Sequence, residues 1–438
     1  MFLNIKFSHI LAVVCIMSLS FTAAAQHHGE SHEEHAAPVE QHQPAEHAEL
    51  QHTDSTAAHA NSEGHEMHHE ESEGELVNGK YDPKPMIFEH IGNANEFHLW
   101  GHTAIPLPCI LWSQEDGLTT CLSSKFEHGH KAFNRYVLHN GVVKRIADST
   151  FPAGEIEVGH IKTTEVEKTE TDSLEYEGKM YAIEKASKIG AFTSWYDFSI
   201  SKNVFTMLLV GLLLCLIFFS VAKAYAKGKD KAPRGLQGFI EPILVFLDSE
   251  VIQPMLGDRS TKFAPYIYVV FFFILFNNLI GLIPIFPGGS NVTGNISTTM
   301  VLALFTFLLT NLNGNREYWG HIFNMPGVPA VLKLLITPVE IIGVFTKPIS
   351  LMIRLFANIT AGHIIILNLV SLIFVFGKAG QSMAGAGAGI ALAVPFTLFM
   401  NVIELVVALI QAFIFSILTA SYIGAATESH GHHEEGHH

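Results

Sequence analysis

The chain has 438 residues, of which 48% are hydrophobic and only 15% are charged, yet its formal net charge is −15. These values are compatible only if the charge is separated from the apolar residues along the chain. Most of the acidic residues and most of the 26 histidines lie in the first half, whereas the second half consists of long apolar runs. The composition therefore excludes a chain that is soluble throughout and predicts that part of it lies in lipid.

Residues 1–25 have the pattern of a secretory signal peptide. Lys6 supplies a basic start, residues 10–19 form an apolar core, and three alanines at 23–25 provide a cleavage site. The apolar core is shorter than the roughly 20 residues that a membrane span needs, which favours cleavage over an uncleaved anchor helix. The residues that follow are therefore expected to lie outside the cytoplasm.

Residues 26–75 and the C-terminal tail 427–438 are rich in His and Glu and show no apolar periodicity. Such segments cannot bury enough surface to offset the entropy of ordering, so we expect disorder. Their imidazole and carboxylate groups could bind zinc, copper or nickel. No fixed ligand spacing is present, however, and the pattern favours solvated tails.

Residues 76–195 contain short β-branched and aromatic runs separated by Asn, Gly, Asp and Pro, which predicts a small β-rich extracytoplasmic domain. The Asn140-Gly141 pair between two apolar runs is a strong hairpin signal. Cys109 and Cys121 would meet an oxidising compartment and could pair. No nucleophile and base stand out, so the sequence does not indicate what this domain does.

Residues 196–426 are predicted to form the membrane domain. A first span begins at Phe198 and is followed by a cluster of basic residues: Lys223, Lys227, Lys229, Lys231 and Arg234. Basic flanks mark the cytoplasmic ends of spans, so the preceding domain is expected outside, in agreement with the signal peptide.

The next segments alternate between the interface and the membrane. Residues 236–257 combine helical apolar spacing with acidic residues and predict an amphipathic helix at the cytoplasmic surface. Residues 265–286 form a second span, and 298–312 a third that returns to the cytoplasm. The loop between these spans has no Lys or Arg, as expected outside. Asn291 begins a glycosylation pattern, which we discount in a bacterial envelope protein.

Two long apolar helices are predicted at 331–376 and 387–426, joined by a short glycine-rich turn. Each has at least about 38 residues, or roughly 57 Å, against a hydrocarbon core of about 30 Å. Either they break at Pro338, Pro348 or Pro395, or they form a strongly tilted hairpin. We favour the hairpin, with kinks at the prolines. The predicted fold class is an all-α polytopic membrane protein with about five membrane helices, preceded by the β-rich domain.

Arg354 lies well inside the first of these helices. An arginine at membrane depth costs roughly 3 kcal/mol, and the guanidinium cannot escape this cost by losing its proton. At about 100° per residue it shares a helix face with Asn358, while His363 falls on the opposite face. Arg354 follows Lys347 by only seven residues, so an arginine that extends to the lipid headgroups remains an alternative.

Glu404 and Gln411 share one face of the last helix. A carboxylate in lipid must pair or become protonated, and His363 on the neighbouring helix is a candidate partner for Glu404. A His–Glu pair can carry protons near neutral pH because imidazole titrates there. The alternative is a hydrogen bond that only holds the two helices together.

Two of these segments resemble a known family. TKPISLMIRLFANITAGH at 346–363 and LIQAFIFSILTASYI at 409–423 are similar to the R-L-x-x-N and Q-A-F-x-F motifs of subunit a of the F-type ATP synthase membrane sector. The resemblance covers about 235–426 and includes several motifs in order. It does not include the His-rich or β-rich regions, which are similar to an extension seen in some bacterial members.

The resemblance implies a subunit that lies against a rotating ring of c subunits, each with an essential carboxylate. Arg354 would be the essential arginine that keeps the facing ring carboxylate ionised, since an opposite charge within about 4–6 Å lowers a carboxyl pKa by 1–3 units. Asn358 and Gln411 match polar positions near that arginine.

Two aqueous half-channels, one from each side of the membrane, are also implied. His363 and Glu404 match the polar pair of the outer half-channel, Asn278 matches a further outer position, and Glu340 matches an acid of the inner one. Gly281 is a departure, because some members have a carboxylate there.

The implied partners are the c ring, subunit b, the rest of the ATP synthase and membrane lipid, with no cofactor and no nucleic acid. No GxxxxGK[ST] loop is present, so the chain is not expected to bind nucleotide or to be an enzyme on its own. The implied location is the bacterial inner membrane, with the N-terminal region periplasmic and the C-terminus cytoplasmic. The alternatives are a metal-ion transporter and a proton-conducting subunit of a redox complex, but the spans offer only His363 and Glu404 as ligands.

Overall fold

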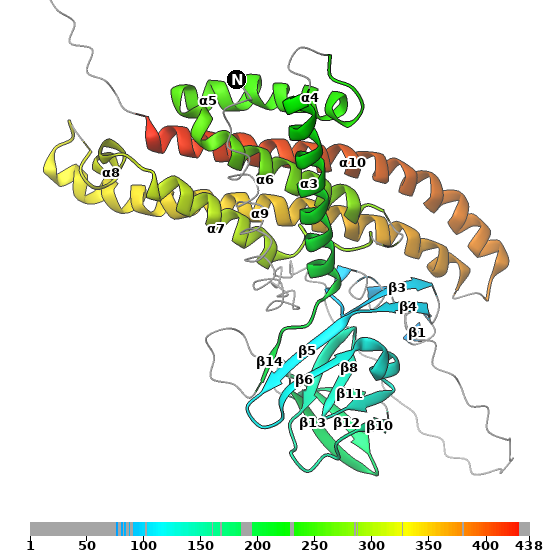
Figure 1. Cartoon of the computed structure of the whole chain (residues 1–438). Coiled ribbons are helices and arrows are strands. Elements are labelled where there is room, and N and C mark those ends of the chain that lie inside the picture. Colours follow the sequence, from blue (N-terminus) through cyan, green and yellow to red (C-terminus); the bar gives the residue numbers. More distant parts are fainter. Residues whose placement is uncertain are drawn as a thin grey trace, which may run out of the picture.

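The computed structural model describes most of the chain after residue 75. The described residues are 76–77, 80–81, 83–84, 87, 91–100, 103–159, 161–166, 169–184, 195–227, 232–283, 286, 288–325, 327–378 and 381–428. The predicted signal peptide, the His-rich segment and nearly all of the C-terminal tail lie outside them. The described residues form a β-rich domain followed by a helical membrane domain (Figure 1).

The β-rich domain contains a seven-stranded antiparallel sheet with the strand order β10-β7-β8-β9-β13-β12-β11. Its strands are β7 (Lys131–Phe133), β8 (Tyr136–His139), β9 (Val142–Ile146), β10 (Glu155–Glu157), β11 (Ile161–Val166), β12 (Thr169–Tyr176) and β13 (Lys179–Glu184). The predicted Asn-Gly hairpin is confirmed: His139 pairs with Val142, and Asn140 and Gly141 have φ of 50° and 72°. Positive φ at both central residues is the requirement of a type I′ turn.

A second sheet has three strands in the order β14-β5-β6. They are β5 (Pro108–Ser113), β6 (Gly117–Leu122) and β14 (Trp195–Asp197). The short pairs β1 (Leu76–Val77) with β2 (Lys80–Tyr81) and β3 (Glu96–Trp100) with β4 (Thr103–Pro106) complete the strands, and a 3₁₀ segment, η2, spans Ser123–Gly129.

Charged side chains join the two larger sheets. The turn between β5 and β6 carries Glu115 and Asp116, and both bind Arg145, which is only 1% exposed. Arg135 donates to the same two carboxylates at 3.0 Å. Hydrogen bonds from Arg135 and then Arg145 hold the pKa of Glu115 below its usual 4.5. The stabilisation from this carboxylate is therefore complete above pH 4.5 and is lost as the pH falls through the lowered pKa.

The membrane domain contains the five predicted membrane helices. They are α3 (Lys202–Lys227), α6 (Ser260–Gly281), α7 (Ile296–Leu312), α9 (Ala330–Gly377) and α10 (Met383–Thr427). Among the described residues, four helical runs are long and apolar enough to cross a membrane, or five if α7 and α8 (Arg316–Phe323), which meet at 102°, form one broken span. The predicted fold class, a polytopic membrane protein with a preceding β-rich region, is confirmed.

The predicted amphipathic segment is helical but irregular. It consists of α4 (Leu236–Leu247), a π-helical turn η3 (Asp248–Ile252), α5 (Gln253–Leu256) and a 3₁₀ turn η4 (Gly257–Arg259). In Figure 1, α4 lies across the upper end of α3, and α5 lies farther away, where it contacts α10.

The prolines do not interrupt the two long helices. Helix α9 has 48 residues and includes Pro338 and Pro348, and α10 has 45 residues and includes Pro395. At 1.5 Å per residue these lengths are roughly 72 Å and 68 Å, more than twice the hydrocarbon thickness. The two helices lie side by side and cross the direction of α3, as the predicted tilted hairpin requires (Figure 1).

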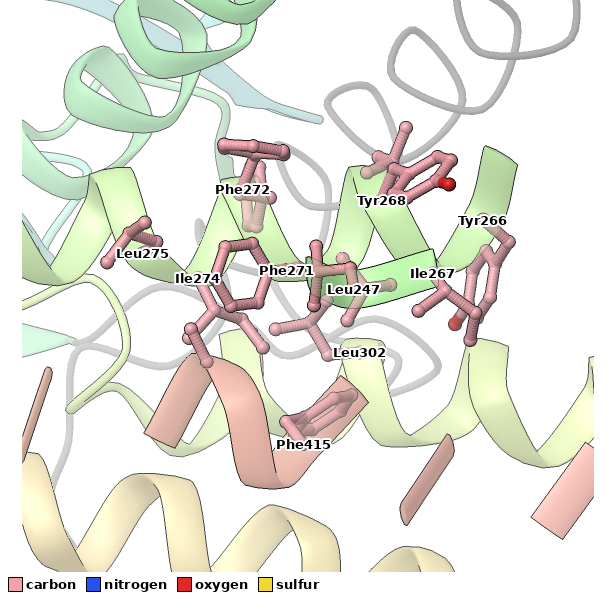
Figure 2. Packing of buried hydrophobic residues seen from close by; sticks show 14 of the residues in the cluster. Leu247, Tyr266, Ile267, Tyr268, Phe271, Phe272, Ile274, Leu275, Leu302 and Phe415 are labelled. Carbon is pink, nitrogen blue, oxygen red and sulfur yellow. The ribbon is translucent and has the colours of Figure 1, made fainter. Parts of the chain in front are cut away.

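Helix α6 forms the centre of the membrane domain, and α9 and α10 form its most exposed side. Figure 2 shows apolar side chains of α6, such as Phe271 and Ile274, packed with Leu302 of α7 and Phe415 of α10. We compared the most apolar 18-residue stretch of each long helical segment. In the segment Leu236–Gly281, which contains α6, 78% of that stretch is buried, against 11% in α9 and 39% in α10. The hairpin of α9 and α10 is therefore the most exposed surface of the membrane domain.

The β-rich domain is held firmly to the membrane domain. Backbone hydrogen bonds run from Phe198 N–H to Ile110 O at 2.8 Å and from Lys202 N–H to Ala94 O at 2.8 Å. The Phe97 ring contacts Phe205 of α3, with centroids 5.6 Å apart. These contacts surround the short junction between β14 and α3 and fix the β-rich domain to the start of this helix.

We expect Asp116→Asn to destabilise the β-rich domain, because it weakens two bonds to the buried Arg145 guanidinium. Bonds to charged groups contribute about 1.5–3 kcal/mol, so protease resistance of this domain in the full-length protein should fall about tenfold or more. Glu157→Gln, at an exposed position of β10, is the matched control. Equal resistance of Asp116→Asn and the control would contradict the role of this cluster.

Candidate functional site

Arg354 and Asn358 lie together on an exposed face of α9. Leu351, Leu355 and Ile359 on the opposite side are buried, with exposures of 1–3%. Both polar residues belong to the exposed class, as does Ile353, which is 51% exposed. The face that carries Arg354 therefore points away from the rest of the chain.

Arg354 has no ion-pair partner within the part of the chain that the structure describes. Lys347, seven residues earlier, lies over the ring of Tyr422, 5.7 Å from its centroid, and so is held against α10. The surface around Arg354 is apolar, with Ile349, Ile353 and Ile365 exposed on the same helix. Arg354 thus places a fixed positive charge, flanked by Asn358, on a largely apolar surface.

His363 and Glu404 form the expected contact between the two long helices. His363 Nδ1 is hydrogen-bonded to Glu404 Oε1. Glu404 is only 3% exposed, and the His363 side chain is 19% exposed. The second carboxylate oxygen, Oε2, is buried and has no hydrogen-bond partner among the residues that the structure describes. The pair therefore has one satisfied and one open oxygen, deep in the membrane domain.

Asn278 of α6 is buried next to the same part of α10. Its Nδ2 donates to Ala408 O at 3.3 Å, one helical turn beyond Glu404, and its Oδ1 accepts from Thr293 Oγ1 at 2.5 Å. Thr360, three residues before His363, donates to Gly294 O at 3.2 Å. The connection between α6 and α7 thus bonds to α9 directly and to α10 through Asn278, near the His–Glu pair.

The sequence did not predict that this connection is buried. Ser290, Asn291 and Thr293 are 0–3% exposed, and Ser290 Oγ donates to Thr206 Oγ1 of α3 at 2.7 Å. A run of Ser, Asn, Thr and Gly has the composition of a solvated loop, and only the clustering of hydroxyl and amide groups could have indicated otherwise. The buried Asn291 side chain also leaves no room for a glycan.

Gln411 lies on the buried face of α10 together with Glu404 and Ala408, and is 5% exposed. Because α9 and α10 are antiparallel and His363 meets Glu404, Gln411 lies at about the level of residue 356 of α9. It is therefore close to Arg354 along the hairpin but faces the interior, whereas Arg354 faces outward.

Glu340 is half-buried near the start of α9 and lies close enough to Tyr318 of α8 to act on it electrostatically. It precedes Arg354 by 14 residues, roughly 21 Å of helix, whereas His363 follows Arg354 by nine, roughly 14 Å. Glu340 and the His–Glu pair thus lie on opposite sides of Arg354 along the hairpin.

No group of three or more His, Cys, Asp or Glu side chains among the described residues is arranged to hold a metal ion. The His-rich segments, on which the metal-transporter alternative depends, lie outside those residues.

Comparison with known proteins identifies the family. The ATP synthase A chain family matches residues 204–424. The chain is 40% identical to an ATP synthase subunit a of Chlorobium phaeobacteroides (strain BS1) over 249 residues, which cover 56% of this chain and 70% of that protein. It is 37% identical to the subunit a of Chloroherpeton thalassium over 270 residues, 61% of this chain and 77% of the relative. The chain belongs to the ATP synthase subunit a family.

A second match covers the β-rich domain. Residues 86–191 match a family described as a domain of unknown function. This subunit a family member therefore combines the membrane domain with a separately recognisable extension.

The structure leaves no room for a side chain at Gly281, the position at which the resemblance predicts a departure from some family members. A Cβ atom added at Gly281 would lie 2.9 Å from Ser290 O. The inward fold of the α6–α7 connection therefore occupies the space that a side chain would need.

Gly362 provides a test of the His–Glu contact. An added Cβ would lie 2.9 Å from Glu404 Oε1, so Gly362→Ala should displace the carboxylate from His363 while the helix gains up to about 1 kcal/mol in propensity. We expect normal assembly and slower ATP-driven proton uptake by inverted vesicles. Gly343→Ala, where an added Cβ has no neighbour within 4 Å, is the control. Equal rates for both variants would contradict a role for this contact.

Proposed function

We propose that this chain is the proton-translocating subunit of an F-type ATP synthase membrane sector, with Arg354 facing the carboxylates of a c-subunit ring. The observation that carries the proposal is the exposed guanidinium on an apolar helix face without a counter-ion in the described chain. A permanent charge at membrane depth requires an anionic or polar neighbour, so the missing partner is expected on another chain.

The chemistry follows from charge proximity. A ring carboxyl that arrives protonated from lipid becomes more acidic next to Arg354, because the guanidinium stabilises the ionised form. It releases its proton there and regains one after it has passed. Asn358, one turn along the same face, can donate a hydrogen bond to the ionised carboxylate.

The His363–Glu404 pair and Asn278 are proposed to carry protons between the β-rich side of the membrane and the ring. The buried Asn277 Oδ1, Asn291 Nδ2 and Glu404 Oε2 have no protein partner among the described residues. Buried polar atoms of this kind commonly bind water, and a chain of waters would connect them to His363. Imidazole can accept and release a proton near neutral pH, which suits a relay.

Glu340 is proposed to serve the opposite route, from the ring to the cytoplasm. Its separation from His363 by Arg354 along α9 supports two routes that do not join. A proton can then cross the membrane only while it is bound to a carboxyl group of the rotating ring, because the fixed positive charge of Arg354 repels protons that would pass directly between the two routes.

The orientation proposed for the chain has the β-rich domain outside and the ends of α3 and α10 in the cytoplasm. The basic residues after α3 and the signal-like N-terminus support it. The apolar faces of α9 and α10 that remain exposed in this chain fit the c ring and lipid, while subunit b and the remaining ATP synthase subunits complete the proposed complex. In that complex this chain binds no nucleotide itself.

Replacing Arg354 with Ala should reduce proton-driven ATP synthesis by membrane vesicles to background while the complex still assembles, because the facing carboxylate would stay protonated. The control is Ile353→Ala, the adjacent exposed residue, which should retain most activity. Coupled synthesis by Arg354→Ala at the control rate would refute the proposal.

Replacing Glu404 with Gln should slow proton entry without preventing assembly, because the amide keeps a hydrogen bond to His363 but cannot exchange a proton. We expect a rate of ATP synthesis at least about a hundredfold lower, because positioned proton transfer contributes roughly 10²–10⁴-fold to a rate. Leu405→Ala, exposed on the next position, is the control. If Glu404→Gln left the rate and its pH profile unchanged, the His363–Glu404 pair would serve only to hold the two helices together.

A further inference from the structure

The β5–β6 hairpin aligns two cysteines. Cys109 of β5 lies directly opposite Cys121 of β6 in the antiparallel register, and both are free thiols. Directly opposed residues have Cα atoms about 4.5–5.5 Å apart and side chains on the same face of the sheet. Disulfides have Cα separations of 4.4–6.8 Å, so this register accepts the bond without backbone movement.

The two thiols have different surroundings. Cys109 is 1% exposed, packs in the cluster with Leu111, Phe126 and Trp195, and lies 3.7 Å from Leu107 O. Cys121 is half-buried at the edge of this cluster. The Cys121 thiol is therefore partly accessible to a reagent, whereas the Cys109 thiol is shielded from solvent.

The hairpin occupies an important place in the fold. Strand β5 lies between β6 and β14, and β14 continues into α3. Asp116 in the turn of this hairpin is bound to Arg145 of the larger sheet. A cross-link between β5 and β6 would stiffen the sheet from which the first membrane helix begins.

We propose that Cys109 and Cys121 form an intramolecular disulfide that cross-links β5 to β6 in the working protein. This rests on the proposed placement of the β-rich domain outside the cytoplasm, where thiols meet disulfide oxidants.

The bond forms by thiol–disulfide exchange with a protein or small-molecule disulfide. The Cys121 thiolate attacks one sulfur of the oxidant and displaces the other as a thiolate. The Cys109 thiolate then attacks Cys121 Sγ and displaces the second oxidant thiolate. Two cysteine thiols lose two protons and two electrons in total, and the oxidant disulfide is reduced to two thiols.

The electrostatic surroundings agree with this order. The hydrogen bond with Cys109, aided by Lys125, lowers the pKa of Cys121. The hydrogen bond with Cys121 and burial raise the pKa of Cys109. Cys121 is thus the thiol that ionises first and is also the more accessible one.

Differential alkylation of the full-length protein tests the proposal. Membranes are denatured in the presence of a first maleimide, which alkylates free thiols. The protein is then reduced and treated with an isotopically distinct second maleimide. We expect the second label on Cys109 and Cys121 and the first label on Cys215 of α3, which is the internal control. Without reduction, a peptide that links 109 to 121 should be 2 Da lighter than the sum of its parts. First label on both cysteines would overturn the disulfide, as would a cross-link between two copies of the chain.

A second variant separates failure of the disulfide from failure of the proposed orientation. In a Cys109→Ser, Cys121→Ser background, Ser124→Cys adds an exposed thiol to the same domain. The variant is treated with an impermeant maleimide in cells whose outer membrane alone has been made permeable. Labelling of residue 124 would show that the β-rich domain lies outside the cytoplasm. If residue 124 of the variant is labelled while Cys109 and Cys121 of the wild-type protein are found reduced, the disulfide alone is rejected; no label at residue 124 would reject the orientation.

Reductant should also lower the protease resistance of the β-rich domain in the wild-type complex about tenfold or more, because the cross-link constrains the unfolded chain. The double serine variant should show no such response. Equal responses to reductant in the two proteins would count against the proposal.

Discussion

The constraint on which this membrane domain depends is an arginine on an apolar helix face that has no ion-pair partner in the described part of the chain. Arg354 cannot lose its charge, and the neighbouring isoleucines offer no counter-ion. A soluble protein would place such a group in water. Here the helix is roughly 72 Å long and runs across the direction of α3, so its exposed face forms an extended apolar surface with one positive charge. That surface suits a partner that is itself apolar and presents acidic groups one at a time.

The opposite, buried side of the same hairpin carries an acidic residue surrounded by polar groups. Glu404 is buried and shares one of its oxygens with His363, and the backbone at Gly362 allows this approach because no side chain intervenes. Asn278 of α6 adds an amide group to the same region, and Thr293 of the connection between α6 and α7 adds a hydroxyl group. A polar interior behind an apolar exterior is costly in lipid, which is why these groups are concentrated where they can bind one another or water.

The β-rich domain is a continuation of the membrane domain rather than a flexible appendage. Strand β14 enters α3 within a few residues, and Phe97 packs on Phe205 of that helix. The buried Arg145 cluster and the aligned cysteines both act on the same three-stranded sheet. The domain can therefore hold the adjoining end of α3 in position.

Local patterns in the sequence determined the apolar spans, the Asn140-Gly141 hairpin and the division of Arg354 and His363 between helix faces, because hydropathy, turn geometry and the helical period act over a few residues. The family motifs added the roles expected of Glu340, Asn358 and Gln411. Tertiary structure alone decided that the 290–295 loop is buried, that the prolines leave α9 and α10 unbroken, and that Gly281 has no room for a side chain. It also set the register that opposes Cys109 to Cys121. These features depend on contacts between segments far apart in the chain, and packing energies, not local preferences, select them.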